Sequence, residues 1–182
     1  MMHCSLVSLG CVFGFSPAPN QVTLTALRAL KIAQRRLRPE VRSKLMGVSS
    51  ARTDESFLPN AWRFTFMDPG TSGKNRVVTV AAKTSSEHPD TIESFKAENS
   101  TYTQVIAQDD LLIDSNKALE KARSSVKLRG VLAAEYHLVQ PRKGGEPIWN
   151  IHFFADMEEP VALMQIGAKT GAVEMMKMAQ AA

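Results

Sequence analysis

Cysteine is scarce in this sequence, and its position excludes a disulfide framework. The chain of 182 residues contains two cysteines, Cys4 and Cys11, and both lie within the first eleven residues. A pair so close to one end cannot staple the body of the fold, and a gap of six residues is a poor zinc-binding spacing. We therefore expect neither disulfides nor a structural zinc in the body of the protein.

Catalytic signatures and long hydrophobic runs are also missing. The sequence contains no His-Glu-x-x-His, Gly-x-Ser-x-Gly, Cys-x-x-Cys or dinucleotide-binding glycine motif, which are short motifs that mark many active sites. Beyond the first residues, no segment reaches the ~18 consecutive apolar residues that suggest a transmembrane helix. We therefore predict a protein that is not an enzyme, carries no cofactor or metal, and does not cross a membrane with its body.

The composition is that of an ordinary globular protein with a mild basic excess. Apolar residues make up 44% and charged residues 22%, and the net charge of +4 comes from 22 basic against 18 acidic residues. The excess gathers on one face of a predicted helix and just after it. This face is either a solvated surface or a site for an anionic polymer or membrane surface, with candidate residues Arg35, Arg36, Arg38 and Arg42. Because no aromatic or glycine-rich stretch accompanies them, we expect no nucleic-acid binding.

The beginning of the chain resembles an export signal. Residues 4–15 are apolar, and the Ser-Pro-Ala-Pro-Asn segment at 16–20 follows them like a spacer. The Leu-Gly-Cys sequence at 9–11 also resembles a lipoprotein cleavage site. We predict that residues 1–21 form a signal or lipoprotein-type segment, which is the only place where a membrane anchor is expected. A misassigned start of the chain or a first buried strand is the alternative.

Two similar segments organise the rest of the chain. One begins at Trp62 and the other at Trp149, and in each the tryptophan is followed at positions +2 and +4 by large apolar residues. Alternation with a period of two predicts a strand with one buried face. The six expected core anchors are Trp62, Phe64, Phe66, Trp149, Ile151 and Phe153.

Helical periodicity precedes each group of strands. Residues 23–37 place apolar side chains at helical spacing, and Thr23 or Thr25 is the expected N-cap. A second helix is expected to begin at Ser115, with Asp114 as its N-cap.

Six strands are predicted, at residues 45–51, 62–68, 77–81, 131–139, 148–154 and 162–168. Between the third and fourth strands the sequence turns polar at residues 83–99. A short helix near 92–96 or an edge strand near 102–106 is expected in this region. The methionine-rich residues 175–178 are expected to pack on the sheet or fray from it.

The two halves follow one plan. The two tryptophans are 87 positions apart, and Lys83 of Ala-Ala-Lys-Thr and Lys169 of Gly-Ala-Lys-Thr are 86 positions apart. Agreement of two different landmarks to within one residue indicates a duplicated unit. We therefore predict a first repeat over residues 22–85, a linker over 86–109 and a second repeat over 110–178.

The second half resembles the PepSY domain family. The resemblance rests on the capped helix at 114–122, the Trp149 strand, and a closing strand that runs into Thr-Gly-x-Val at 170–173. It covers residues 110–176. The first half matches less well, because Ser85 stands where the second half has a glycine.

The resemblance implies an α+β fold of two tandem cystatin-like units, each with one helix packed on a three- to four-stranded antiparallel sheet. It also implies export, since the family occurs in propeptides of secreted metallopeptidases and in envelope proteins, where it restrains peptidases. The family offers no catalytic residues. Its marker residues here, Trp149 and Gly171, are explained by packing and by a tight backbone turn.

His137 and His152 are the only candidates for chemistry. They lie on two strands joined by one hairpin, with Glu135 on the same face as His137, so a metal site or a catalytic pair can form there if the register allows it. The region has no third histidine. A metal-dependent enzyme or metal-binding protein that uses this face is therefore the alternative function.

Our leading hypothesis is an exported protein of the periplasm or cell envelope that is not an enzyme. It is expected to bind another protein, such as a peptidase, through a sheet face or a sheet edge.

Overall fold

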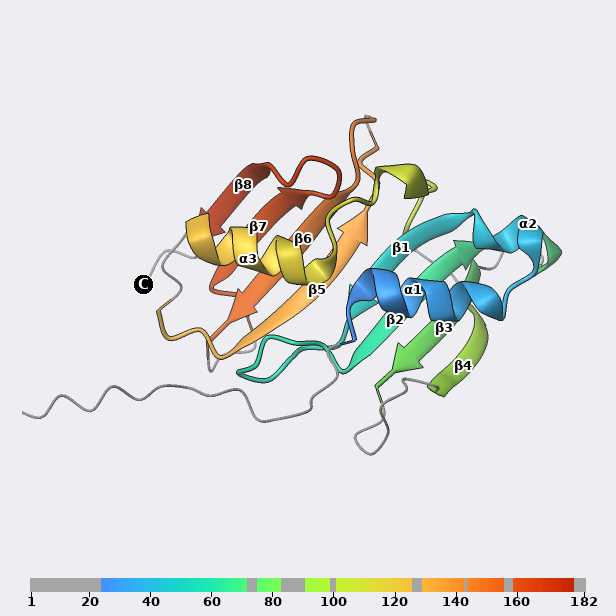
Figure 1. Ribbon diagram of the computed structural model, residues 1–182, viewed down its shortest axis with the longest axis horizontal. Coiled ribbons are helices and arrows are strands. Elements are labelled where there is room, and N and C mark those ends of the chain that lie inside the picture. The colour runs from blue at the N-terminus through green and yellow to red at the C-terminus, as the bar shows by residue number, and fades with distance from the viewer. Residues whose placement is uncertain are drawn as a thin grey trace, which may run out of the picture.

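The computed structural model describes residues 24–71, 75–82, 91–98, 101–125, 129–142, 144–155 and 159–178. Its strands are β1 (Leu45–Ser50), β2 (Ala61–Met67), β3 (Asn75–Ala81), β4 (Thr91–Glu98), β5 (Ala133–Val139), β6 (Ile148–Phe154), β7 (Ala162–Gly167) and β8 (Val173–Met178). In the described part of the chain they form one eight-stranded sheet, in the order β4-β3-β2-β1-β5-β6-β7-β8 (Figure 1). Every neighbouring pair is antiparallel. The β1–β5 pair joins two four-stranded meanders at the centre of the sheet.

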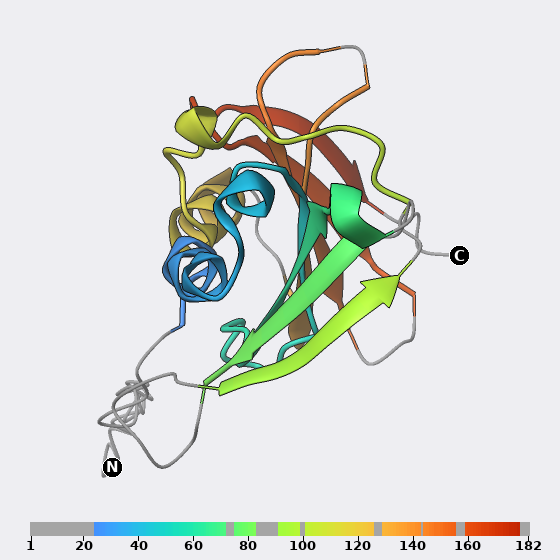
Figure 2. The ribbon, with the colours of Figure 1, turned by 90° about the vertical axis from the view of Figure 1, so that its right-hand side faces the viewer.

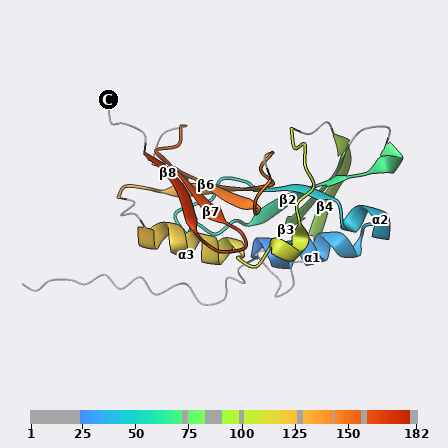
Figure 3. The same ribbon diagram turned by 90° about the horizontal axis from the view of Figure 1, so that it is seen from above.

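The described helices are α1 (Ala26–Arg35), the short α2 (Pro39–Arg42) and α3 (Ser115–Ser125), with 3-10 turns η1 (Pro69–Thr71) and η2 (Gln108–Asp110). Helix α1 packs against β2 and β3, and α3 packs against β6, β7 and β8. Both lie on the same side of the sheet, one after the other along the row of strands (Figures 1 and 3). We call this side the inner face and the opposite side the outer face. Helices packed on an antiparallel sheet confirm the mixed α and β class.

The core lies between the helices and the inner face, and the two tryptophan strands supply its centre. The fully buried large side chains include Trp62, Phe64, Phe66, Trp149, Ile151 and Phe153. Each such side chain contributes roughly 1.5–3 kcal/mol by leaving water. The two tryptophan rings meet edge to face, with centroids 6.2 Å apart. The two halves therefore share one hydrophobic cluster, which contains buried residues of both.

The two helices begin at a shared point. Thr25 occupies the N-cap position of α1 but makes no side-chain cap hydrogen bond. Instead, the Leu27 N–H donates to Asp114 Oδ1 at 3.0 Å, and the Ala26 N–H donates to Ser115 Oγ at 3.1 Å. Thr25 therefore holds the predicted N-cap position, but its side chain makes no cap hydrogen bond, and the start of α3 supplies the acceptors instead. Thr23, the other candidate, lies outside the described residues.

The region between the halves differs from the prediction. Residues 91–98, inside the expected linker, form β4 at the edge of the sheet, while residues 102–106 form no strand. Both alternatives offered for this region were wrong. Ile92 and Phe95 are three residues apart, as in a helix, but a bulge in β4 pairs them with the alternate positions Val80 and Val78 of β3.

The end of the chain is more ordered than expected. The methionine-rich residues belong to β8, which pairs with β7 along its length. Gly171 sits in the β7–β8 turn with φ +70°, a conformation that favours glycine, and its N–H donates to the Gly167 carbonyl at 2.8 Å.

Candidate functional site on the outer face of the sheet

A row of polar residues crosses the outer face. Cross-strand pairing joins Thr79 to Arg63, Arg63 to Ser49, Ser49 to His137, His137 to Asn150, and Asn150 to Gln165. Directly paired residues place their side chains on the same face of a sheet. We call this set the polar row; its members, from β3 to β7, are Thr79, Arg63, Ser49, His137, Asn150 and Gln165.

The position of the polar row follows from the register of the core. Each member is next in sequence to a buried core residue, as Asn150 is to Trp149 and Arg63 is to Phe64. Because side chains alternate along a strand, fixing the core residue on the inner face fixes its neighbour on the outer face. Most of the row is half-buried, and Arg63 is exposed.

Tyr102 reaches the outer face from the connection between the halves. Its ring lies against Gly47 of β1, where a Cβ atom would overlap the ring. The Tyr102 and Ser49 side chains are hydrogen-bonded, and burial raises the pKa of the Tyr102 hydroxyl. Arg63 and Glu135 are close enough to act on this hydroxyl electrostatically. Tyr102 thus adds an aromatic ring beside the centre of the polar row.

The two histidines meet on this face. His137 pairs with Asn150 and His152 pairs with Glu135, so the imidazoles are diagonal neighbours with ring centroids 5.5 Å apart. His137 Nε2 lies 3.3 Å from Glu135 Oε1. The pKa of His152 is lowered, first by burial and then by the nearby His137, with Glu135 acting in the opposite direction. The group offers imidazole nitrogens and one carboxylate for hydrogen bonding.

We found no metal centre in the part of the chain that the structure describes: nowhere in it do three His, Cys, Asp or Glu side chains gather in a way that can hold an ion. The histidine pair and Glu135 are therefore residue types that bind metals, but their side chains are not arranged around a common point where an ion could sit.

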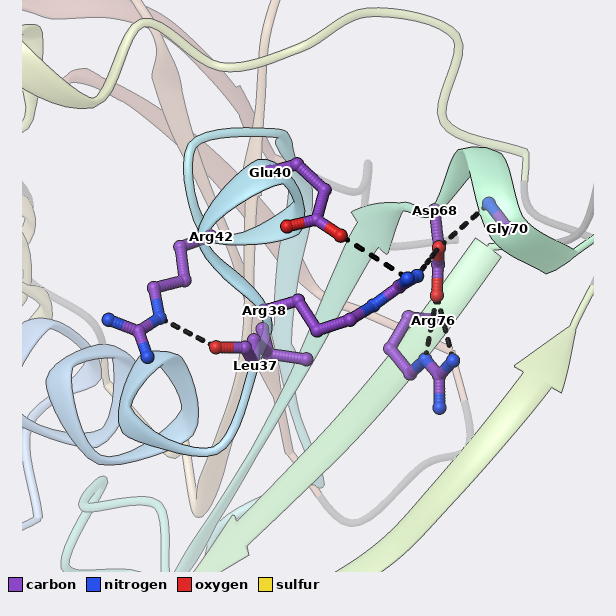
Figure 4. Close-up of polar contacts among 7 residues, drawn as sticks. All are labelled: Leu37, Arg38, Glu40, Arg42, Asp68, Gly70 and Arg76. Atoms are coloured by element: carbon purple, nitrogen blue, oxygen red, sulfur yellow. Dashed lines mark hydrogen bonds and ion pairs between the residues drawn. The ribbon is translucent and has the colours of Figure 1, made fainter.

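The four candidate arginines do not form one surface. Arg38 donates to Asp68 Oδ1 at 2.9 Å and lies 3.2 Å from Glu40 Oε1 (Figure 4). Arg35 and Arg42 line a hollow on the other side of α2, and Arg36 is exposed without lining it.

Asp68 is the centre of a structural ion-pair network. Its side chain is 1% exposed, and Arg76 donates to Oδ2 through Nε at 3.0 Å and Nη2 at 2.7 Å. The Gly70 N–H donates to Oδ1 at 3.0 Å, so Asp68 also caps the turn that follows β2. The hydrogen bond from Arg76 is the largest of the contacts that lower the pKa of Asp68.

Most of the outer-face residues could not be identified as site residues from the sequence. Ser49, Arg63, Asn150 and Gln165 look like ordinary solvent-facing strand positions, and only the pairing register aligns them. The alternation beside each tryptophan identifies their face. It does not identify their partners across strands, because register depends on the neighbouring strand.

Comparison with known proteins gives one fold-level match. No protein-family model and no curated protein sequence matches the chain. A crystal structure from Clostridium difficile 630, titled as that of a "putative lipoprotein", is similar with a TM-score of 0.59 at 14% sequence identity. The similarity covers 87% of this chain and 95% of that one, so the two share a fold over nearly their whole length.

None of the helices in the described part of the chain is both long enough and apolar enough to span a membrane.

Proposed function

We propose that this protein is an exported, non-enzymatic binding protein of the cell envelope, and that it binds a protein partner through the outer face of its sheet. The polar row is the observation that carries the proposal. The inner face of the same strands is filled by the helices and the core. In the described part of the chain, no helix covers the outer face (Figures 2 and 3).

The size of the polar row suits a protein partner. It spans six strands, and a spacing of ~4.8 Å between strands gives a length of about 24 Å. A strip of this length and comparable width covers roughly 600 Å², so a standard interface of about 800 Å² on each partner would include the polar row and the residues beside it. A site for a drug-sized organic molecule would instead need a concave, mostly apolar pocket.

The composition of the face also suits protein recognition. Tyr102 and Arg63 belong to residue types that are enriched at interfaces and among their energetic hot spots. Gln165 Nε2 already donates to Asn150 Oδ1 at 2.6 Å, which limits the freedom of both amides before a partner arrives. Preordered polar side chains lose less entropy on binding.

The cell-envelope location and the class of partner rest on other observations. Residues 1–21 have the pattern of an export or lipoprotein signal, and the structural neighbour carries the description of a lipoprotein. The second half resembles the PepSY family, and that resemblance implies two tandem cystatin-like units over the whole chain. Because the family restrains peptidases, the resemblance supports a peptidase as the partner. Restraint of that peptidase is the activity we propose. The open strand edges at β4 and β8 are the alternative contact surface.

The test compares matched arginine variants. Arg63→Glu reverses a charge on the outer face, and Arg28→Glu reverses one on the exposed side of α1. Purified protein is immobilised and exposed to cell-envelope extract, and the retained proteins are assayed for peptidase activity with and without added free protein. We expect retention of a peptidase by the wild type and by Arg28→Glu, and its loss with Arg63→Glu. Equal retention by both variants would contradict binding through the outer face.

A further inference from the structure

A surface hollow beside α2, away from the outer face, is lined by several charged and polar side chains. It measures about 500 Å³ and lies between the end of α1, α2 and η2. Three cationic side chains line it, those of Lys31, Arg35 and Arg42, and none of its lining residues is acidic.

Two acidic side chains near the hollow in sequence, Glu40 and Asp110, form ion pairs with residues that do not line it, while Asp109 next to Gln108 is exposed. Arg38 points toward Asp68, while Arg42 points the opposite way, toward Leu37 (Figure 4). Arg38 also pairs with Glu40, which removes that carboxylate as a partner for the cations of the hollow. Within the described residues, none of the three cations that line the hollow forms an ion pair.

The hollow is held in shape by a hydrogen-bond network between the two halves of the chain. Gln34 Nε2 on α1 donates to Gln108 Oε1 on η2 at 2.7 Å. Gln108 Nε2 donates to the Arg42 carbonyl at 2.9 Å, and Arg42 Nε donates to the Leu37 carbonyl at 2.6 Å. The Arg42 guanidinium is thereby fixed in direction, with its two terminal nitrogens left for a ligand.

A purely structural role does not account for all three cations. A basic residue in the last turn of a helix offsets the partial negative charge of that end, which explains Arg35. Arg42 holds the same position in the short helix α2 and donates to the Leu37 carbonyl just after α1, so it has a structural role as well. Lys31 lies one turn before the end of α1, so that explanation does not reach it.

We infer that this hollow is a binding site for a compact oxyanion group, a phosphate or a sulfate. Arginine guanidinium groups bind such oxygens in a bidentate way, and lysine adds a point charge. The neutral amide of Gln108 keeps one N–H for a ligand, since its other N–H donates to the Arg42 carbonyl, whereas both N–H groups of Gln34 are already donated to Arg42 and Gln108. The site is independent of the proposed function, which uses the opposite side of the sheet.

The test uses inorganic phosphate as the probe. Phosphate is titrated into the full chain at low ionic strength, with binding measured by calorimetry for the wild type, Arg35→Gln, Arg42→Gln and Arg36→Gln. The last variant removes the same charge from a neighbouring position that does not line the hollow. We expect saturable binding that weakens roughly tenfold in the first two variants and less than about twofold in Arg36→Gln. Since Arg42→Gln also removes a hydrogen bond to the backbone, thermal denaturation checks its fold and Arg35→Gln carries the conclusion.

A second arm identifies the source of the oxyanion. The same four proteins are sedimented with phosphatidylcholine vesicles that contain or lack phosphatidylglycerol. Sedimentation that needs the anionic lipid, Arg35 and Arg42, and that phosphate competes away, would support the site with a lipid headgroup as its source. Phosphate binding without sedimentation would support a free anion as the source. Binding lost equally in Arg36→Gln, or absent in both arms, would overturn the proposal.

Discussion

Trp62 and Trp149 make the same contact in the two halves of the chain. The Nε1–H of Trp62 donates to the Leu24 carbonyl at 2.7 Å, and that of Trp149 donates to the Ile113 carbonyl at 2.9 Å. Each carbonyl lies two residues before the helix of its own half. The two indoles then meet edge to face at the centre of the molecule. Each tryptophan therefore ties its strand to the start of its helix, and together they tie the halves to each other.

Substituting either tryptophan should destabilise the whole chain by a similar amount. Trp62→Phe and Trp149→Phe each leave a carbonyl without its donor and remove packed volume, at a cost of about 2–4 kcal/mol in the free energy of unfolding. Because the core is shared, we expect each variant to unfold in one transition by chemical denaturation. Two separate transitions would show that the halves fold independently.

Gly47 should tolerate no side chain while Tyr102 is in place. A Cβ at Gly47 would overlap the Tyr102 ring, so Gly47→Ala must displace it, at a cost of about 1–3 kcal/mol in unfolding free energy. In the Tyr102→Ala background the same substitution should cost much less. Urea denaturation of the two single variants and the double variant measures this coupling. Strictly additive effects would show that the ring does not press on Gly47 in solution.

Stability should fall as the pH drops below about 6.5, in part because of His152. The fold lowers the pKa of this histidine, so the unfolded chain takes up its proton at a higher pH than the folded chain does. Proton binding then favours unfolding, and the stability present above pH 6.5 is lost as the pH falls through the folded value. His152→Gln should flatten the dependence between pH 7 and 5, which denaturation at each pH will show. If the dependence of unfolding free energy on pH is the same in His152→Gln as in the wild type, other groups cause it.

Asp68 should control acid stability at a lower pH. Its pKa is lowered in the fold, so its contribution is present above the ordinary carboxyl value and is lost as the pH falls through the folded value. Asp68→Asn removes the charge that Arg76 and Arg38 share and should cost about 1–3 kcal/mol at neutral pH. Glu40→Gln, at an exposed ion pair, is the control and should cost less than about 1 kcal/mol.

Local pattern predicted the parts of the fold whose signal lies within one segment. The Trp149 strand was placed at 148–154, as observed, and the helix at Ser115 began where expected, because the periodicity that marks both lies within one segment. The bulge in β4, the capping of α1 by Asp114 and the placement of Tyr102 on Gly47 each depend on a distant segment. Periodicity in one stretch of sequence carries no information about them.

The candidate site was predictable in the same limited sense. His137 and His152 were placed on neighbouring strands from the sequence, but their diagonal contact depends on the register that pairs His152 with Glu135. The structure was also needed to show that Arg38 lies apart from Arg35 and Arg42. Arg38 donates to Asp68, which lies 30 residues further along the chain.

Photo-cross-linking from the outer face tests the central claim most directly. A photoreactive residue is placed at Asn150, in the polar row, or at Lys117, which is exposed on α3, and each protein is irradiated in cell-envelope extract. We predict a discrete cross-linked protein from position 150 and none from position 117. A cross-link from position 117 alone would place the partner on the helices and contradict binding through the outer face of the sheet.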